Sequence, residues 1–429
     1  MYPYINDYCR IIQSYVGGSA ILLCDNQFIK HDFNRTGYEI IELCTGEKTV
    51  DEIIESFKSK YLLDEEDVKT ITQFLDEYKK YGVIQMGSEK RGRRLRVYGN
   101  QNIITPISVS MELTNQCQLN CIHCFNSSGN PKSEEMGISK FMELANDFVN
   151  LGVTGFFITG GEPFLKRDVN ELVGFLGKNA VTATFASNAV SISERTMDLL
   201  EKYPNLGIQV SLDGLEENHD FIRNVKGAFQ KSVNNIKKMT QRGISVAVSY
   251  TMNDYNTNDL PALIELCKSI GCEGINIGLN SNSGRAKENR VPIEVANNFA
   301  EILQSSNKQY STEDFFVGLD ICEKKISTVM DQIEHPNKCG AGYNALHVMP
   351  NGNITPCPAI PNIVLGNVHE RKLLEILYFD NIKHSMMLPT PVKKLCGSCE
   401  LYDECGNCIA SMLDQPEEVC HVQRYLQKA

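Results

Sequence analysis

The sequence lacks any long apolar run, so we expect no membrane-spanning segment. No signal-like apolar stretch follows Met1, and no apolar run reaches the length that a bilayer requires. Trp is absent, which decides nothing, and no fixed-period repeat or low-complexity tract occurs. The net charge of −11 argues against nucleic acid and against binding to an anionic membrane. We expect a cytoplasmic globular protein of two or three domains, because the chain has 429 residues of which 42% are apolar.

Cysteine, in contrast, is abundant, and ten of the 16 cysteines fall into two groups. The first group lies in the run Cys-Gln-Leu-Asn-Cys-Ile-His-Cys and consists of Cys117, Cys121 and Cys124. The second group consists of Cys339, Cys357, Cys396, Cys399, Cys405, Cys408 and Cys420. A reducing compartment keeps thiols free, so clustered cysteines there indicate metal and not disulfides.

The first group favours iron–sulfur clusters over zinc. Zinc remains an alternative for the doublets Cys396-x2-Cys399 and Cys405-x2-Cys408, whose spacing suits a small zinc knuckle. The loop that begins at Cys117, however, has no fourth soft ligand nearby, and His123 is better placed as a wall of the site. Three thiolates leave one iron of a four-iron cluster without a protein ligand, where a cofactor or substrate can bind. Together the ten cysteines predict three clusters.

Residues 1–88 predict a small winged-helix-like domain. Residues 19–24 and 27–30 are typical of a hairpin, and three amphipathic helices are expected over 36–45, from the capping box at Thr49, and over 64–81. A winged helix often binds DNA, but nine basic and fifteen acidic residues give this part a net charge of −6, which excludes a phosphate backbone as its partner. Residues 89–106 begin with a basic, polar stretch and are expected to be a linker.

From residue 107 the pattern changes to short apolar strands that alternate with helices. Strands are predicted over 108–113, 155–159, 183–187, 207–212, 245–250 and 274–278, with helices such as 194–202 and 228–242 between them. This order indicates an α/β fold, a partial (β/α)6 TIM-like barrel, whose active site lies at the carboxyl ends of the strands. The cysteine loop and the sequence Gly160-Gly-Glu-Pro163 each follow such a strand end.

Cys-x3-Cys-x2-Cys after the first strand and Gly-Gly-Glu-Pro after the second resemble the radical S-adenosylmethionine (radical SAM) superfamily, over 107–310. The second cysteine group resembles the SPASM domain, over 311–429, although Cys405-x2-Cys408 has one intervening residue fewer than usual. The N-terminal part resembles, by element order, the recognition element of maturases that act on ribosomally made peptides (RiPPs). The whole chain is most similar to thioether-forming maturases of the sactisynthase and ranthipeptide type, and Cys339-Gly-Ala-Gly-Tyr343 is the local feature that most suggests them.

This resemblance implies roles for individual residues. Cys117, Cys121 and Cys124 would hold the radical SAM cluster, whose open iron chelates the amine and carboxylate of the cofactor. The remaining predicted cofactor contacts are His123, Gly160, Gly161, Glu162, Pro163, Ser187, Asn188, Ser211, Asp213 and Arg223. The two glycines would let the backbone approach the cofactor, Glu162 would face its ammonium group, and Arg223 would form a fork with its carboxylate. For Ser187, Asn188, Ser211, Asp213 and Arg223, loop capping or surface pairing remains an alternative.

The cysteine count bears on the auxiliary clusters. By resemblance, Cys396, Cys399, Cys405 and Cys420 close one cluster, and Cys339, Cys357 and Cys408 hold the other. Two closed four-iron clusters need eight ligands, so the second is one short. Either Cys322 or another side chain completes it, or its iron is open to a substrate thiolate. Cys9, Cys24, Cys44, Cys267 and Cys272 are expected to be buried apolar fillers.

The function that these features predict is modification of a precursor peptide by a 5′-deoxyadenosyl radical, with a thioether cross-link to a cysteine as product. The resemblance also implies S-adenosylmethionine and three [4Fe–4S] clusters as cofactors, and a low-potential electron donor such as flavodoxin or ferredoxin. Three alternatives remain open: a carbon–carbon cross-link in a peptide, oxidation of a sulfatase residue to formylglycine, and a peptide chaperone with purely structural clusters.

Overall fold

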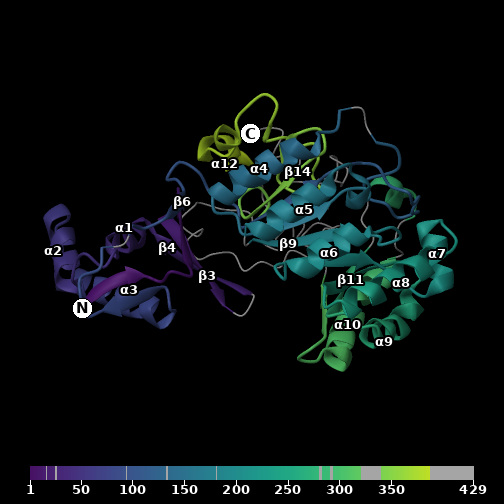
Figure 1. The fold of residues 1–429 in the computed structure, drawn as a ribbon, viewed down its shortest axis with the longest axis horizontal. Coiled ribbons are helices and arrows are strands. Elements are labelled where there is room, and N and C mark those ends of the chain that lie inside the picture. Colours follow the sequence, from purple (N-terminus) through teal and green to yellow (C-terminus); the bar gives the residue numbers. More distant parts are fainter. Residues whose placement is uncertain are drawn as a thin grey trace.

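The computed structural model describes residues 1–15, 17–24, 27–92, 94–131, 134–179, 181–279, 283–289, 293–319 and 340–386. Six of the seven cysteines of the second group, and Cys322, lie outside these residues. Figure 1 shows a small N-terminal domain beside a larger α/β body, with α12 and β14 next to α4. Within the described part, no helix is long and apolar enough to cross a membrane.

The N-terminal domain packs three helices against a sheet. Its strands are β1 (Tyr2–Ile5), β2 (Cys9–Ser14), β3 (Gly17–Cys24), β4 (Gln27–Asn34), β5 (Ile84–Gly87) and β6 (Val97–Gly99), and its helices are α1 (Arg35–Leu43), α2 (Val50–Lys60) and α3 (Glu65–Lys80). The sheet order is β4-β3-β2-β6, so β4 is at an edge, and β1 pairs separately with β5.

The predicted hairpin and three helices are confirmed, and the Thr49 capping box forms as expected. Asp64 makes a second capping box at the start of α3. The hairpin belongs to a four-stranded sheet, and the winged-helix comparison stays a prediction. Part of the segment expected to be a linker forms β6, which pairs with β2 and fastens the domain to the chain that enters the barrel.

Seven parallel strands form the open barrel. They are β7 (Ser108–Glu112), β8 (Gly155–Thr159), β9 (Thr182–Ser187), β10 (Leu206–Ser211), β11 (Ser245–Met252), β12 (Gly274–Leu279) and β13 (Phe316–Leu319). The helices between them are α4 (Ile138–Asn150), α5 (Val169–Lys178), α6 (Glu194–Lys202), α7 (Glu216–Arg223), α8 (Ala228–Gln241), α9 (Leu260–Ser269) and α10 (Ile293–Tyr310), with 3-10 turns at Pro163–Leu165, Thr257–Asp259 and Gly284–Glu288. The six predicted strands are confirmed, and β13 is an additional one.

The sheet continues beyond β7 into the C-terminal region. There, β14 (Ala345–Val348) pairs in parallel with β7, and β15 (Asn353–Thr355) and β16 (Gly366–Asn367) follow it, as do α11 (Leu373–Ile376) and α12 (Phe379–Met386). The first barrel strand is therefore hydrogen-bonded directly to the region that carries the second cysteine group.

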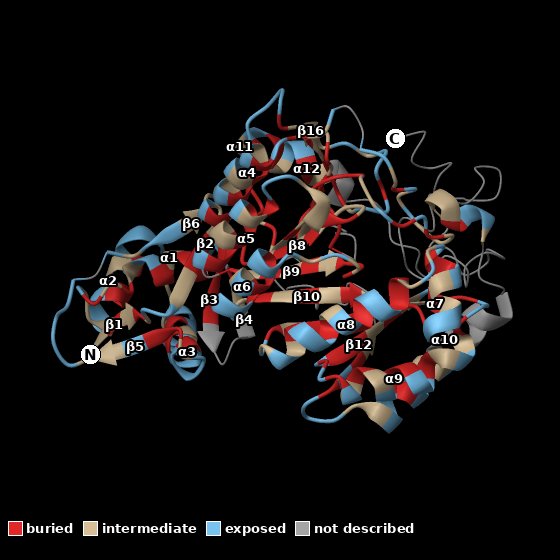
Figure 2. Ribbon diagram, turned by 45° about the vertical axis from the view of Figure 1, so that its right-hand side comes forward, coloured by how far each residue is buried: buried red, intermediate tan, exposed pale blue. Residues whose placement is uncertain are grey.

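Alternation along the strands determines what faces the barrel interior. In β11, Val246, Val248, Tyr250 and Met252 are buried in the layer that packs against the helices, where they belong to the main hydrophobic core. The intervening positions are Ser245, Ala247, Ser249 and Thr251. Figure 2 shows the buried residues concentrated along β8, β9, β10 and β12, between the helices. Small polar side chains are thus left to line the interior, toward the carboxyl ends of the strands.

Candidate functional site

The cysteine loop follows β7 and forms one wall of a cavity of about 300 Å³. The opposite wall comes from the carboxyl-terminal halves of β8 to β12, including Gln209, Ser249 and Thr251. Ten predicted site residues line this cavity: Cys117, Cys121, Cys124, His123, Gly160, Gly161, Ser187, Asn188, Ser211 and Arg223. Three further predicted cofactor contacts, Glu162, Pro163 and Asp213, are buried behind its surface.

Each of the three cysteine sulfurs accepts a hydrogen bond from a nearby N–H group. The amide of Leu119 donates to Cys117 Sγ over 3.5 Å, and that of Ser128 donates to Cys124 Sγ over 3.4 Å. Arg223 Nη1 lies 3.6 Å from Cys121 Sγ. Hydrogen-bond donors aimed at sulfur stabilise the thiolate. They also raise the reduction potential of a cluster that the thiolates ligate.

Burial has the opposite effect on these groups when no metal is bound. It raises the pKa of Cys117 to about 11, and burial also raises the pKa of Cys121 against the lowering effect of the Arg223 charge. A positively charged metal centre would supply the compensation that these buried thiolates need.

Three thiol groups on one cavity wall are a donor set that fits a four-iron cluster. Among the residues that the structure describes, no three His, Cys, Asp or Glu side chains converge as ligands of one metal ion. A four-iron cluster binds each thiolate through a different iron, so its ligands do not meet at one point. Three cysteines spread along a cavity wall, each with an N–H donor, agree with that requirement.

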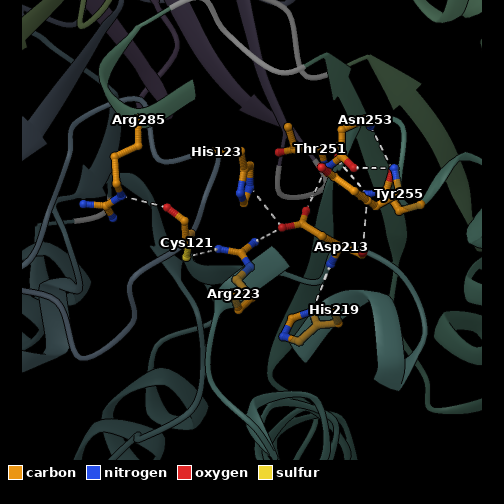
Figure 3. Close-up of polar contacts among 10 residues, drawn as sticks. Cys121, His123, Asp213, His219, Arg223, Thr251, Asn253, Tyr255 and Arg285 are labelled. Atoms are coloured by element: carbon orange, nitrogen blue, oxygen red, sulfur yellow. Dashed lines mark hydrogen bonds and ion pairs between the residues drawn. The ribbon is translucent and has the colours of Figure 1, made fainter. Parts of the chain in front are cut away.

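Asp213 connects His123 and Arg223 behind the cavity (Figure 3). Its Oδ2 lies 2.6 Å from Arg223 Nη2 and 3.0 Å from His123 Nε2, and its Oδ1 accepts the amide N–H of Thr251. Burial alone would raise the pKa of Asp213, but the charges of Arg223 and His123 lower it. In this structure Arg223 therefore pairs with Asp213 and Cys121, and the cofactor roles inferred for Asp213 and Arg223 stay predictions.

His219 supports the same aspartate from its other side. Its Nδ1 accepts the backbone N–H of Asp213 over 3.1 Å, which requires the neutral ring with the proton on Nε2. Burial, aided by the Arg223 charge, lowers the pKa of His219 to about 4 and so favours this neutral form.

Glu162 is fully buried and organises the end of β9. Its carboxylate accepts hydrogen bonds from Ser187 Oγ and from the amide of Asn188, both over 2.9 Å. Burial raises the pKa of Glu162 to about 7 although these donors oppose the shift. Asn188 in turn accepts a hydrogen bond from Gln118 of the cysteine loop, so Glu162 helps to fix the loop against the barrel.

The two glycines have a steric role that sequence reasoning did not assign. A Cβ at Gly160 would come within 2.7 Å of Thr114 O, and one at Gly161 would clash with the backbone of Gln116. The Gly161 amide also donates to Thr114 O over 2.7 Å. Small residues are needed here because the backbone after β8 packs against the chain that enters the cysteine loop. Pro163 begins the short 3-10 turn that follows.

Sequence reasoning missed Glu112 and His347, which connect the C-terminal region with the cysteine loop. Glu112, at the end of β7, accepts a 2.6 Å hydrogen bond from Asn126 of the loop. His347 Nε2 lies 3.5 Å from Glu112, and its Nδ1 lies 3.2 Å from Ser110 Oγ. The available signal for Glu112 was a carboxylate near the end of a strand that was predicted to lead into the site. Sequence reasoning also missed Arg285, which lines the cavity.

Of the second cysteine group, only Cys357 is among the described residues, in the segment after β15. The amide of Gly342 donates to Pro356 O over 3.2 Å, so the residues just after Cys339 in sequence lie beside Cys357. Cys339 itself lies outside the described residues, and its assignment with Cys357 to one cluster stays a prediction.

Three parts of the chain match known families. Residues 111–267 match the radical SAM superfamily, residues 339–409 match an iron–sulfur cluster-binding domain (SPASM), and residues 30–84 match coenzyme PQQ synthesis protein D (PqqD). These matches confirm the family resemblance found in the sequence.

Two similar curated proteins come from Bacillus subtilis (strain 168). The sporulation killing factor maturation protein SkfB is 29% identical over 284 residues, which cover 66% of this chain and 67% of SkfB. The antilisterial bacteriocin subtilosin biosynthesis protein AlbA is 25% identical over 423 residues, 94% of this chain and 92% of AlbA.

The fold of this chain resembles that of SuiB from Streptococcus suis. The structure of SuiB bound to S-adenosylmethionine has a TM-score of 0.70 at 16% identity, and covers 97% of this chain and 100% of SuiB. The structure of SuiB bound to the precursor peptide SuiA has a TM-score of 0.68 at 16% identity, and covers 98% of this chain and 100% of SuiB. At this identity, the likeness establishes the fold alone.

Proposed function

We propose that this radical SAM enzyme, which also carries SPASM and PqqD-type domains, modifies a ribosomally made precursor peptide by forming a cysteine thioether cross-link. One observation carries the proposal: a three-cysteine loop lines a barrel cavity in a chain that aligns almost end to end with a bacteriocin biosynthesis protein. SkfB is named for the maturation of a sporulation killing factor, and AlbA for the biosynthesis of a bacteriocin.

The cavity residues have separate tasks in this proposal. Cys117, Cys121 and Cys124 would hold the cluster, which with S-adenosylmethionine bound would supply a carbon-centred radical able to take hydrogen from the peptide. Gly160, Gly161, Ser187, Asn188 and Ser211 line the cavity and are proposed to contact the cofactor. The interior surface formed by Gln209, Ser249 and Thr251 offers neutral hydrogen-bonding groups to a peptide segment.

In this scheme the SPASM cysteines would hold the clusters that accept the second electron. Formation of a thioether from a C–H and an S–H group removes two protons and two electrons. The radical takes one proton and one electron together, as a hydrogen atom. An auxiliary cluster would accept the other electron, and the thiol proton would pass to solvent or a base. We assign Cys396, Cys399, Cys405 and Cys420 to one cluster and Cys339, Cys357 and Cys408 to the other, whose remaining ligand would be Cys322, another side chain or the substrate thiolate.

The leader of the precursor is proposed to bind the N-terminal domain by strand addition at the edge strand β4, beside α3. His31 of β4 stacks on Tyr81, the residue that caps the end of α3, at a ring-centroid distance of 4.1 Å. Ile29 lies two residues away, on the same face of the strand, and its side chain is 45% exposed. Main-chain pairing would supply affinity, and an apolar leader side chain would cover Ile29. SuiB bound to SuiA provides a precedent for peptide binding on this fold.

A low-potential donor such as flavodoxin or ferredoxin would reduce the cluster, and a reducing cytoplasm suits the many free thiols. The proposal is tested by co-expressing the enzyme with a short cysteine-containing open reading frame encoded beside it, followed by mass spectrometry of the peptide. A thioether removes two hydrogen atoms and protects one cysteine from alkylation. Loss of two hydrogens with every cysteine still alkylated would instead indicate a carbon–carbon cross-link. An unmodified peptide, with formylglycine found in a co-expressed sulfatase, would overturn the assignment to precursor peptides.

A further inference from the structure

Residues 283–289, here called the clamp segment, lie directly against the cysteine loop although the two are far apart in sequence. Arg285 and Cys121, which are in contact, are separated by 164 positions. The clamp segment contains the 3-10 turn Gly284–Glu288 and comes after β12, the sixth barrel strand. Nothing in the radical SAM motifs assigns it a role.

Arg285 contacts the cysteine loop through three groups. Its side-chain Nε donates to Cys121 O over 2.8 Å, its Nη1 donates to Ser128 O over 3.0 Å, and its backbone N–H donates to Cys124 O over 3.0 Å. The guanidinium therefore joins the two ends of the loop segment that carries the second and third cysteines. Figure 3 shows Arg285 approaching the backbone of Cys121, while Arg223 approaches its sulfur.

The remaining contacts come from the two ends of the clamp segment. Asn289 Nδ2 donates to Ile122 O over 3.0 Å. Gly284 has a φ of +58°, and a Cβ there would clash with the carbonyl oxygens of Cys124 and Phe125. One short segment thus donates hydrogen bonds to four carbonyl groups of the loop. At Gly284 it packs so closely against the loop that no side chain would fit.

The topology explains why such a contact matters. The strands pair in the order β13-β12-β11-β10-β9-β8-β7, so β7 and β12 are not neighbours in the sheet. The cysteine loop extends from β7, and the clamp segment follows β12. With strand pairing alone, the distance between the cysteine loop and the clamp segment would depend on the curvature of the sheet. The Arg285 contacts set this distance directly, across the mouth of the cavity.

We propose that Arg285 is a positioning residue that holds the cysteine loop at a fixed place across the barrel mouth, so that a radical formed at the loop meets the peptide and not solvent. Arg285 acts through the loop backbone and touches none of the three sulfurs in the described contacts. The part of this inference that concerns the radical rests on the proposed function, and the part that concerns the loop does not.

Lysine cannot replace the fork, because one ammonium group cannot match the planar guanidinium that serves both Cys121 O and Ser128 O. We therefore expect Arg285→Lys and Arg285→Ala to behave alike, with Gly284→Ala as a second, independent disruption of the same contact. Lys287→Ala is the matched control, since Lys287 is an exposed cation of the same segment.

Two measurements separate the parts of the proposal. Hydrogen–deuterium exchange of residues 117–129 in metal-free protein should be at least about tenfold faster in Arg285→Ala and Arg285→Lys, as expected for loss of charge-assisted hydrogen bonds. In the reconstituted enzyme, the ratio of 5′-deoxyadenosine released to peptide modified should rise several-fold in both variants at an unchanged melting temperature.

The results contradict the proposal in distinct ways. Unchanged exchange in Arg285→Ala, or the same acceleration in Lys287→Ala, would show that the clamp segment does not hold the loop. Faster exchange with an unchanged ratio would limit Arg285 to a structural contact and overturn its positioning role. A wild-type enzyme that releases no 5′-deoxyadenosine would refute the proposed function, while the exchange result would still decide the loop contact.

Discussion

Arg223 and Asp213 form an ion pair of 2.6 Å in which both side chains are buried, and the same guanidinium reaches Cys121 Sγ at 3.6 Å. Breaking a buried pair leaves an uncompensated charge, whereas breaking an exposed pair costs little. The pair joins α7 to the segment after β10, and the Cys121 contact joins the same arginine to the cysteine loop. Loss of the pair should therefore affect both the stability of the barrel and the environment of the sulfur.

Replacement of Asp213 by Asn should lower the free energy of unfolding by about 3–5 kcal/mol, because Arg223 would remain buried without its partner charge. Asp198→Asn is the matched control, since Asp198 pairs with Arg242 at the same 2.6 Å but is two-thirds exposed. That variant should lose less than about 1 kcal/mol. Denaturant unfolding of both variants at equal cluster loading measures the difference, and equal losses would show that the buried pair has no special weight.

Replacement of Cys117, Cys121 and Cys124 together by Ala should abolish reductive cleavage of S-adenosylmethionine and leave the auxiliary clusters in place. The three cysteines lie on one loop, far in sequence from the second group. Iron analysis should fall from about twelve per chain to about eight. An undiminished rate of 5′-deoxyadenosine formation with dithionite would refute the assignment, and zinc in place of iron would refute the auxiliary clusters.

Glu162 should make the protein less stable as the pH rises through neutrality. Its pKa is raised from 4.5 to about 7 in the folded protein, mainly by burial, so the folded state binds the proton more tightly than the unfolded chain. The resulting stabilisation is complete below pH 4.5 and is lost as the pH rises to about 7. Glu162→Gln should remove this slope, which is at most about 1.4 kcal/mol per pH unit. Unfolding curves of both proteins at several pH values provide the test, and parallel pH profiles would contradict it.

Replacement of Ile29 by Asp should weaken leader binding at least about tenfold, since the loss of one apolar side chain buried on binding is worth roughly 1.5–3 kcal/mol. Leu62→Asp is a suitable control, because Leu62 is also apolar and exposed but lies between α2 and α3, away from β4. Fluorescence anisotropy with a labelled leader measures both.

Deletion of residues 1–88 should remove leader binding and leave uncoupled cofactor cleavage intact. A truncated enzyme that modifies the precursor normally would overturn the recognition role.

The sequence allowed prediction of the elements and of the residues that gather at the cavity, because hydrophobic periodicity and cysteine spacing are local signals. It did not reveal which of these residues touch one another. Arg223 and Asp213 were expected to reach the cofactor separately, and only their positions in space show that they pair. Gly160 and Gly161 were predicted to lie against the cofactor, and the structure shows that their closest neighbours are backbone atoms of the chain that enters the cysteine loop.

Contacts between distant segments were beyond prediction for the same reason. Glu112 and His347 come from β7 and β14, which become neighbours only when the C-terminal region extends the barrel sheet. Arg285 follows the last predicted strand, where no periodicity or motif remained to guide interpretation. The role proposed for its side chain follows only from the loop carbonyls that it contacts in the folded chain.

The central claim, that a radical formed at the cysteine loop takes hydrogen from a precursor peptide, is tested most directly by isotope transfer. A precursor deuterated at the residue that becomes cross-linked would be incubated with reduced enzyme and S-adenosylmethionine, and the 5′-deoxyadenosine analysed by mass spectrometry. The account predicts 5′-deoxyadenosine that carries one deuterium, in step with formation of a thioether. Unlabelled 5′-deoxyadenosine alongside cross-linked peptide would contradict it.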